Sequence, residues 1–230
     1  MWWNQAFEAA GFRNAFIVEV LPGDADPMDI RYNMINWVHR STRGWSSGGT
    51  VADPRTGEII KATVTLGSLR DRQDYMIFEG LLSPYDTGTE KPSILYETAI
   101  ARIRQLSAHE VGHTLGLRHN FRASTVYPLT KLADPAWTRD HGIAGSVMDY
   151  TPINIAANSE AQGAYFEPTI GPYDYWAIEY AYRQLPRQTE NDELARIAAR
   201  GATDPLLAFS SDEEAIAGLD PDASRFDLGS

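Results

Sequence analysis

The segment from residue 109 to residue 119 constrains the fold of this 230-residue chain more than any other. It reads His-Glu-Val-Gly-His-Thr-Leu-Gly-Leu-Arg-His and holds three of the chain's five histidines. His109 and His113 are four residues apart, so on a helix both imidazoles project from one face. Gly116 accepts the positive φ that ends a helix, and this turn lets His119 approach from another direction. The segment therefore predicts a helix through His113, a sharp turn and three converging imidazoles.

Three converging imidazoles are typical of a catalytic metal site, which keeps one position open, whereas structural sites are closed by four protein ligands. Imidazole nitrogens suit zinc, copper, nickel or iron, and three neutral histidines beside a carboxylate most often indicate zinc. Zinc lowers the pKa of bound water to about 7, and the adjacent Glu110 can take the remaining proton as the water attacks a carbonyl. We therefore expect one catalytic Zn²⁺, held by His109, His113 and His119, with Glu110 as general base.

Composition excludes several other kinds of site. The chain has no cysteine, which rules out disulfides, thiolate zinc sites, iron–sulfur clusters and a cysteine nucleophile. Its formal net charge of -11 argues against a surface that binds nucleic acid. No apolar run approaches the ~20 residues of a membrane-spanning helix. We therefore expect no nucleic-acid partner and no membrane-spanning segment.

Hydrophobic periodicity predicts a sheet that is followed by helices. Four strand candidates lie near the start of the chain, at residues 16–21, 30–40, 49–52 and 59–66, and a hairpin turn joins the last two. Helical patterns cover residues 1–11, 68–82, 92–115 and 172–185. The region 120–162 is rich in proline and glycine, so we expect it to consist mainly of loops.

The tail from residue 186 to residue 230 carries ten acidic and four basic residues. Such a charge excess is typical of a solvated surface segment, and we expect this one to pack on a partner region outside the chain. The chain opens within a helical pattern and ends without a closing element. We therefore expect a piece of a longer protein, whose flanking regions are its partners.

The pattern His-Glu-x-x-His-x-x-Gly-x-x-His is the signature of the metzincin metallopeptidases, and the chain resembles that clan in a second feature. Residues 146–150 read Ser-Val-Met-Asp-Tyr and are similar to the methionine turn of the clan. By this resemblance, Met148 forms an apolar floor beneath the ligand histidines and does not bind the metal. Astacin-like and serralysin-like metzincins carry a tyrosine two residues after the methionine, which assigns Tyr150 a catalytic role. Its phenol would bind zinc at rest and then swing away to stabilise the oxyanion; the alternative is a packed tyrosine bonded to a loop carbonyl.

Further segments resemble the bacterial zinc-dependent metalloprotease family known as Met-zincin: residues 2–7, 53–59 and 113–120. The resemblance covers most of residues 1–185 and implies an α/β, or α+β, fold. It implies a mixed, mostly parallel twisted sheet, a long active-site helix and a loop-rich lower subdomain. The predicted domains are a metzincin-like catalytic domain at 1–185, with an upper part at 1–116 and a lower part at 117–185, and an acidic C-terminal extension at 186–230. A bacterial, secreted or periplasmic protein is implied as well.

One strand and three single residues outside the two motifs also have expected roles. In the metzincin resemblance, residues 49–52 form the edge strand over the cleft, where an extended peptide binds by strand addition; the alternative is an ordinary hairpin arm. Asp174 has a metzincin-like setting and could anchor its helix near the methionine turn. His39 and His141 are expected to be surface or packing residues, because the motif already supplies three ligands.

The resemblance implies a zinc-dependent endopeptidase that acts on peptide or protein substrates. Two alternatives stay open. One is a catalytically degenerate module that keeps zinc and holds peptides without cutting them, against which the intact Glu110 argues. The other is a metal-dependent hydrolase of non-peptide amides, which would use the same residues and differ only in its substrate.

Overall fold

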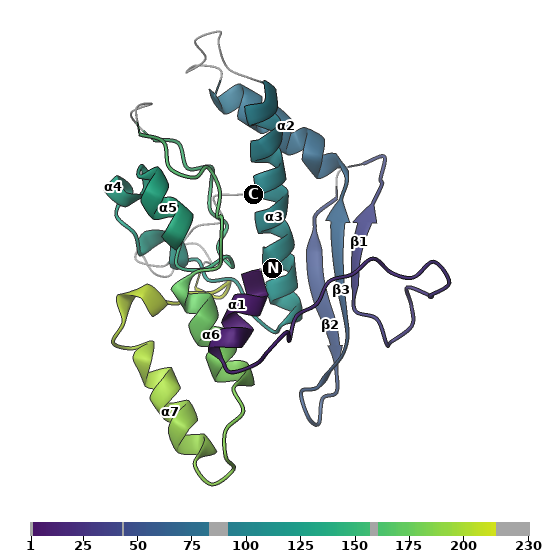
Figure 1. The fold of residues 1–230 in the computed structure, drawn as a ribbon, viewed down its shortest axis with the longest axis vertical. Coiled ribbons are helices and arrows are strands. Elements are labelled where there is room, and N and C mark those ends of the chain that lie inside the picture. The colour runs from purple at the N-terminus through teal and green to yellow at the C-terminus, as the bar shows by residue number, and fades with distance from the viewer. Residues whose placement is uncertain (1, 43, 83–91, 157–160, 215–230) are drawn as a thin grey trace. The chain divides into compact units, whose positions relative to one another are not determined.

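A computed structural model describes residues 2–42, 44–82, 92–156 and 161–214. These residues form seven α-helices and a small mixed sheet of three strands, so the predicted α+β class is confirmed (Figure 1). The chain divides into two compact units, one of residues Val18–Leu117 and one of Met1–Ile17 with Arg118–Ser230. Among the described residues, no helix has both the length and the apolar character that crossing a membrane requires.

The unit Val18–Leu117 contains the sheet. Its strands are β1 (Met34–Val38), β2 (Ser47–Ala52) and β3 (Ile59–Gly67), arranged in the order β1-β3-β2 (Figure 1). β1 runs parallel to β3, whereas β2 pairs antiparallel with it. The prediction of a mostly parallel sheet was therefore wrong, because the short turn between β2 and β3 permits only antiparallel pairing.

Three of the four predicted strands are present, and the fourth, at residues 16–21, is not. This apolar run has no regular structure, and residues 17–20 are exposed: Val20 is 95% accessible and Ile17 68%. No described strand pairs with the run, so its backbone lacks the ladder hydrogen bonds that a strand needs. Hydrophobic composition alone could not reveal that absence.

Two helices complete this unit, as predicted: α2 (Leu69–Leu82) and α3 (Pro92–Thr114). α3 packs against α2 and against β2 and β3. Burial alternates along β3, the pattern of a strand with one face on a helix. The buried apolar residues of the unit are Ala62, Val64, Leu66, Phe78, Ala99 and Val111. This packing fixes the position of α3, which carries the first half of the histidine motif.

The regular elements described in the other unit are all helices. α1 (Trp2–Ala9) packs on α6 (Pro172–Tyr182), with the rings of Phe7 and Tyr182 5.1 Å apart. Among its described residues, the predicted loop-rich region holds only short helices, namely η2 (Ala123–Thr125), α4 (Leu129–Leu132) and α5 (Pro135–His141). Within the unit, α6 also packs against α7 (Glu190–Arg200) and the turn η3 (Pro205–Leu207).

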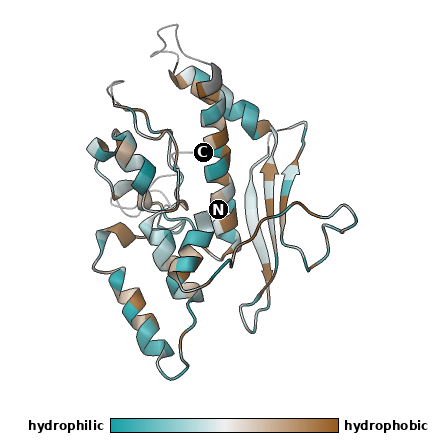
Figure 2. Cartoon of the chain, viewed as in Figure 1, coloured by the Kyte–Doolittle hydropathy of each residue, from teal (hydrophilic) through white to brown (hydrophobic). Residues whose placement is uncertain are grey.

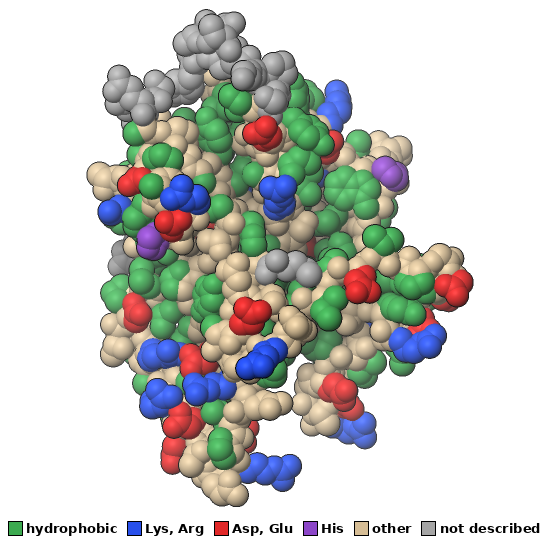
Figure 3. All heavy atoms as spheres, in the orientation of Figure 1, with side chains coloured by type: hydrophobic (Ala, Val, Ile, Leu, Met, Phe, Trp, Pro, Cys, Tyr) green, Lys and Arg blue, Asp and Glu red, His purple; other side chains and the backbone are tan. Residues whose placement is uncertain are grey.

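The described part of the acidic tail, residues 186–214, is a mainly exposed surface segment that also packs on its own unit. Ile197 of α7 is completely buried, and Trp176 Nε1 donates to its carbonyl oxygen at 2.7 Å. Figure 2 shows hydrophobic residues among the hydrophilic ones of α7. Acidic and basic side chains lie side by side in this part of the molecule (Figure 3). On α7, Arg196 Nη2 pairs with Glu193 Oε2 at 2.7 Å. The overall charge of the tail concealed an amphipathic helix.

Candidate metal centre

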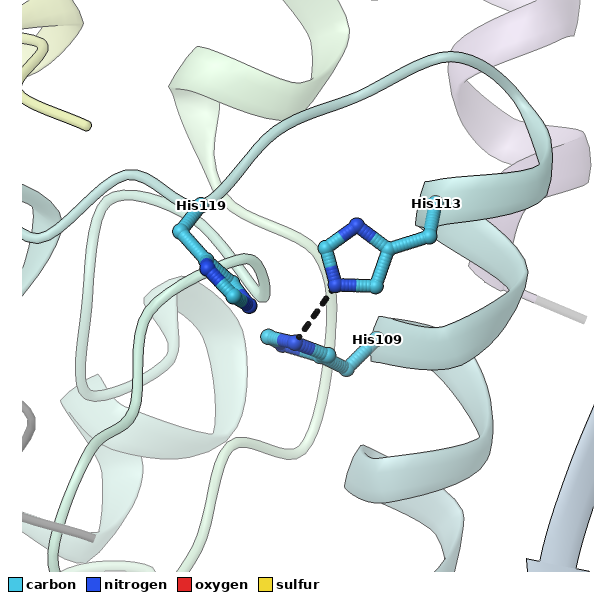
Figure 4. Close-up of side chains that lie close together, drawn as sticks. All are labelled: His109, His113 and His119. Carbon is cyan, nitrogen blue, oxygen red and sulfur yellow. Dashed lines mark hydrogen bonds between the residues drawn. The ribbon is translucent and has the colours of Figure 1, made fainter. Parts of the chain in front are cut away.

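The last two turns of α3 present the first two histidines as their spacing predicts. His109 is buried, and its Nε2 lies 3.2 Å from Nε2 of His113 (Figure 4). Nδ1 of His113 lies 2.9 Å from the carbonyl oxygen of Leu117, which can only accept, so Nδ1 carries the proton. The lone pair of His113 is therefore on Nε2, the atom that faces His109.

The helix ends where the glycine was expected to end it. Gly116 has a φ of 87°, and the N–H of Leu117 donates to the carbonyl oxygen of Gly112 at 3.1 Å. This left-handed residue and the bond across it close the helix and reverse the chain. Only five residues separate His113 from His119, so the turn returns the third imidazole to the end of α3.

The ligand atoms of His109, His113 and His119 all lie within 4.8 Å of one another, and the imidazoles turn toward one another in Figure 4. A tetrahedral zinc binds nitrogen at about 2.0–2.1 Å, which places two bound nitrogens about 3.3 Å apart, close to the His109–His113 separation. Three imidazole nitrogens are also a donor set that suits zinc. The residues present therefore fit the expected ion.

Residues 91–230, well over half of the chain, match the family model described as Met-zincin. The chain belongs to the Met-zincin family. No curated protein and no solved structure matches it. Family and histidine group together indicate a zinc metallopeptidase.

Glu110 of this Met-zincin is buried on α3, the helix on which β2 packs. Burial raises its pKa to about 7, while a hydrogen bond from the backbone N–H of Gly48 lowers it, as do the charges of Arg102 and Arg70. A Cβ at Gly48 would overlap the backbone carbonyl of Glu110, so β2 can approach α3 this closely only with glycine there. Gly48 was not among the residues predicted from the sequence. The signal was a glycine pair inside a strand, which often marks a close backbone approach.

The segment expected to be the methionine turn is held by Asp174 of α6. Asp174 accepts from Ser146 Oγ at 2.6 Å, from the Val147 N–H at 2.9 Å and from the Gly171 N–H at 2.8 Å. The predicted anchoring role of Asp174 is therefore confirmed. Met148 follows directly and is completely buried. Burial raises the pKa of Asp174 to about 6, against the lowering effect of these hydrogen bonds.

Tyr150 lies against the third histidine of the motif. Its ring centroid is 4.5 Å from that of His119, and its backbone N–H donates to Asp149 Oδ1 at 2.7 Å.

The remaining two histidines of the chain are surface or packing residues, as predicted. His39 is exposed, and His141 stacks on Trp137 with ring centroids 4.6 Å apart.

An acidic residue of the tail also reaches the motif. Asp212 Oδ1 lies 2.8 Å from Nδ1 of His119. Asp212 was not among the residues predicted from the sequence, because 93 positions separate the two residues. No local motif marks it among the many acidic residues of the tail.

Proposed function

We propose that this Met-zincin chain is a zinc-dependent endopeptidase in which His109, His113 and His119 hold the ion. The observation that carries the proposal is the convergence of three imidazoles; the buried Glu110, next to His109 in the sequence, adds a carboxylate. When bound, zinc would polarise a substrate carbonyl and lower the pKa of water. The Met-zincin family supports peptide hydrolysis over other reactions of such a site.

Glu110 is the general base in this proposal. It takes the proton of the attacking water and passes it to the leaving amine, which needs a carboxylate fixed in one orientation. Two features of the chain support that orientation: the helical backbone of α3 and the hydrogen bond from the Gly48 N–H.

Tyr150 donates a hydrogen bond to the oxyanion that develops on the substrate carbonyl. Its ring lies against that of His119, one of the three proposed zinc ligands, so the phenol is close to the proposed metal centre. Met148 is the buried methionine of the turn before it.

We also assign the protein, by family resemblance, to a bacterial secreted or periplasmic setting.

The substrate backbone binds along β2. Among the strands that the structure describes, β2 is at one edge of the sheet, and five of its six residues are exposed. An unpaired edge offers backbone donors and acceptors to an extended peptide, which would add to the sheet as a further strand. Because these hydrogen bonds involve only backbone groups, we expect the site to bind extended peptides with little selectivity for their side chains.

The test combines zinc content with cleavage of a proteome-derived peptide library by the complete chain. We expect one zinc per chain, cleavage within peptides, loss of cleavage on chelation and its return with added zinc. A chain that binds no stoichiometric zinc overturns the proposal. Zinc and peptide binding without product would establish the degenerate module instead, and turnover of non-peptide amides alone would establish the other hydrolase.

A further inference from the structure

The described end of the tail runs beside the residues that follow the third histidine. The N–H of Phe121 donates to the carbonyl oxygen of Ser210 at 2.8 Å, and the Ser210 N–H donates to Asn120 Oδ1 at 3.2 Å. Asn120 Nδ2 in turn donates to the carbonyl oxygen of Ala208 at 3.0 Å. Ser210 and Ser211 are both buried. The tail is therefore held in register with residues 120–121 up to Ser210, two residues before Asp212.

This register places the carboxylate of Asp212 against His119. Oδ1 of Asp212 lies 2.8 Å from Nδ1 of His119, and Ser211 Oγ donates to Oδ2 at 3.2 Å. An ionised carboxylate only accepts hydrogen bonds, so the proton of the imidazole is on Nδ1. The lone pair is then on Nε2, a buried atom that can bind a metal ion.

We propose that Asp212 is a positioning residue that fixes the ring orientation and tautomer of His119 for zinc. The inference rests on the proposed function, because it takes the ion to be the one expected there. A carboxylate behind a ligand imidazole also makes the nitrogen that binds the metal more basic. The loss of such a partner typically weakens metal binding about 10–100-fold. The acidic tail thus completes the metal centre.

The neighbouring Glu213 provides a matched control. It carries the same charge, but its Oε1 pairs with Arg118 at 2.7 Å, whereas the carboxylate that lies against His119 is that of Asp212. Asp212 lies farther from the same arginine, at 3.7 Å. Removing either side chain removes one negative charge from the same short segment. Only the removal of Asp212 takes the acceptor from His119, so the difference between the two variants isolates the hydrogen bond.

The experiment measures zinc affinity by competition with a chromophoric chelator for the complete chain and its variants Asp212→Ala, Asp212→Asn and Glu213→Ala. We expect Asp212→Ala to weaken zinc binding about 10–100-fold. Asp212→Asn keeps an acceptor oxygen and loses the charge, so its affinity should fall between that of Asp212→Ala and the wild type. Glu213→Ala should stay within about twofold of the wild type, because exposed ion pairs contribute little. Thermal unfolding of the zinc-free chains identifies any variant that fails to fold.

The outcomes separate this inference from the proposed function. Wild-type zinc affinity in both Asp212 variants, or equal losses in Asp212→Ala and Glu213→Ala, overturns the positioning role and leaves the endopeptidase standing. If Asp212→Ala fails to fold, the isosteric Asp212→Asn decides, and an unchanged affinity there overturns the inference. A wild-type chain without stoichiometric zinc overturns the proposed function and this inference with it.

Discussion

At the scale of single residues, Glu110 separates metal binding from turnover. Glu110 directly follows the ligand candidate His109 in the sequence and is not one of the three converging imidazoles, so Glu110→Gln should leave the donor set unchanged. We expect this variant to keep one zinc per chain and to lose cleavage by about 10²–10⁴-fold, the usual contribution of a general base. Zinc analysis and peptide turnover on the same preparation measure both effects. Loss of zinc together with turnover would instead make Glu110 part of the binding site.

Tyr150 offers a second test at the residue scale. Loss of an oxyanion donor typically costs about 10²–10³-fold in kcat, whereas the ring contact with His119 survives in phenylalanine. Tyr150→Phe should therefore keep its zinc, keep KM within a few-fold and lose most of kcat. Steady-state kinetics with one defined peptide measures this split. Turnover equal to that of the wild type would show that Tyr150 has a packing role and no catalytic one.

At the scale of elements, the approach of β2 to α3 depends on one glycine. A Cβ at Gly48 would overlap the backbone carbonyl of Glu110, whereas a Cβ at Gly49 would meet nothing within 4 Å. Gly48→Ala should lower the free energy of unfolding by about 1–3 kcal/mol, because neither backbone can yield without moving its element. Urea unfolding of Gly48→Ala and Gly49→Ala measures the contrast. Equal stability of the two variants would show that β2 can withdraw from α3 without cost.

The elements that the sequence predicted well are those with local causes. Periodicity and a terminal glycine predicted α3 and its end at Gly116, and a turn signal at 53–57 predicted the hairpin of β2 and β3. The errors involve partners that are distant in sequence. The run 16–21 has the composition of a strand but no pairing strand among the described residues, and α7 finds its apolar partner in α6.

The same division applies to the candidate site. Eleven consecutive residues contain all three imidazoles and Glu110, so their spacing revealed them. Gly48 and Asp212 reach the motif from a neighbouring strand and from the tail, and their roles follow from tertiary packing alone.

At the scale of the whole molecule, a buried carboxyl couples stability to pH. Burial raises the pKa of Asp174 from its ordinary value of 3.8 to about 6. A raised pKa favours folding fully below about pH 4, and this contribution is lost as the pH rises through 6. In Asp174→Asn the amide can satisfy the same neighbours without ionising. Between pH 4 and 7, the unfolding free energy of the zinc-free wild type should therefore fall by roughly 2–3 kcal/mol relative to the variant. Urea unfolding of both proteins at each pH measures the difference in unfolding free energy. A difference that does not change with pH would show that Asp174 has an ordinary pKa in the folded chain.

The predicted domain boundary requires that residues 1–185 fold without the tail, and the packing of the tail argues against this. Ile197 is completely buried, Leu207 is 6% accessible, and both belong to elements that pack on α6. A chain that ends at residue 185 would expose the apolar surface that these side chains cover and would lose the hydrogen bond from Trp176. Deleting even one large buried side chain typically costs about 2–5 kcal/mol. We therefore expect the shortened chain to unfold at a markedly lower temperature than the complete chain, and to bind zinc at least as weakly as Asp212→Ala. Calorimetry and the chelator competition measure the two effects. An unfolding temperature and zinc affinity equal to those of the complete chain would make residues 1–185 an autonomous catalytic domain and the tail an appendage.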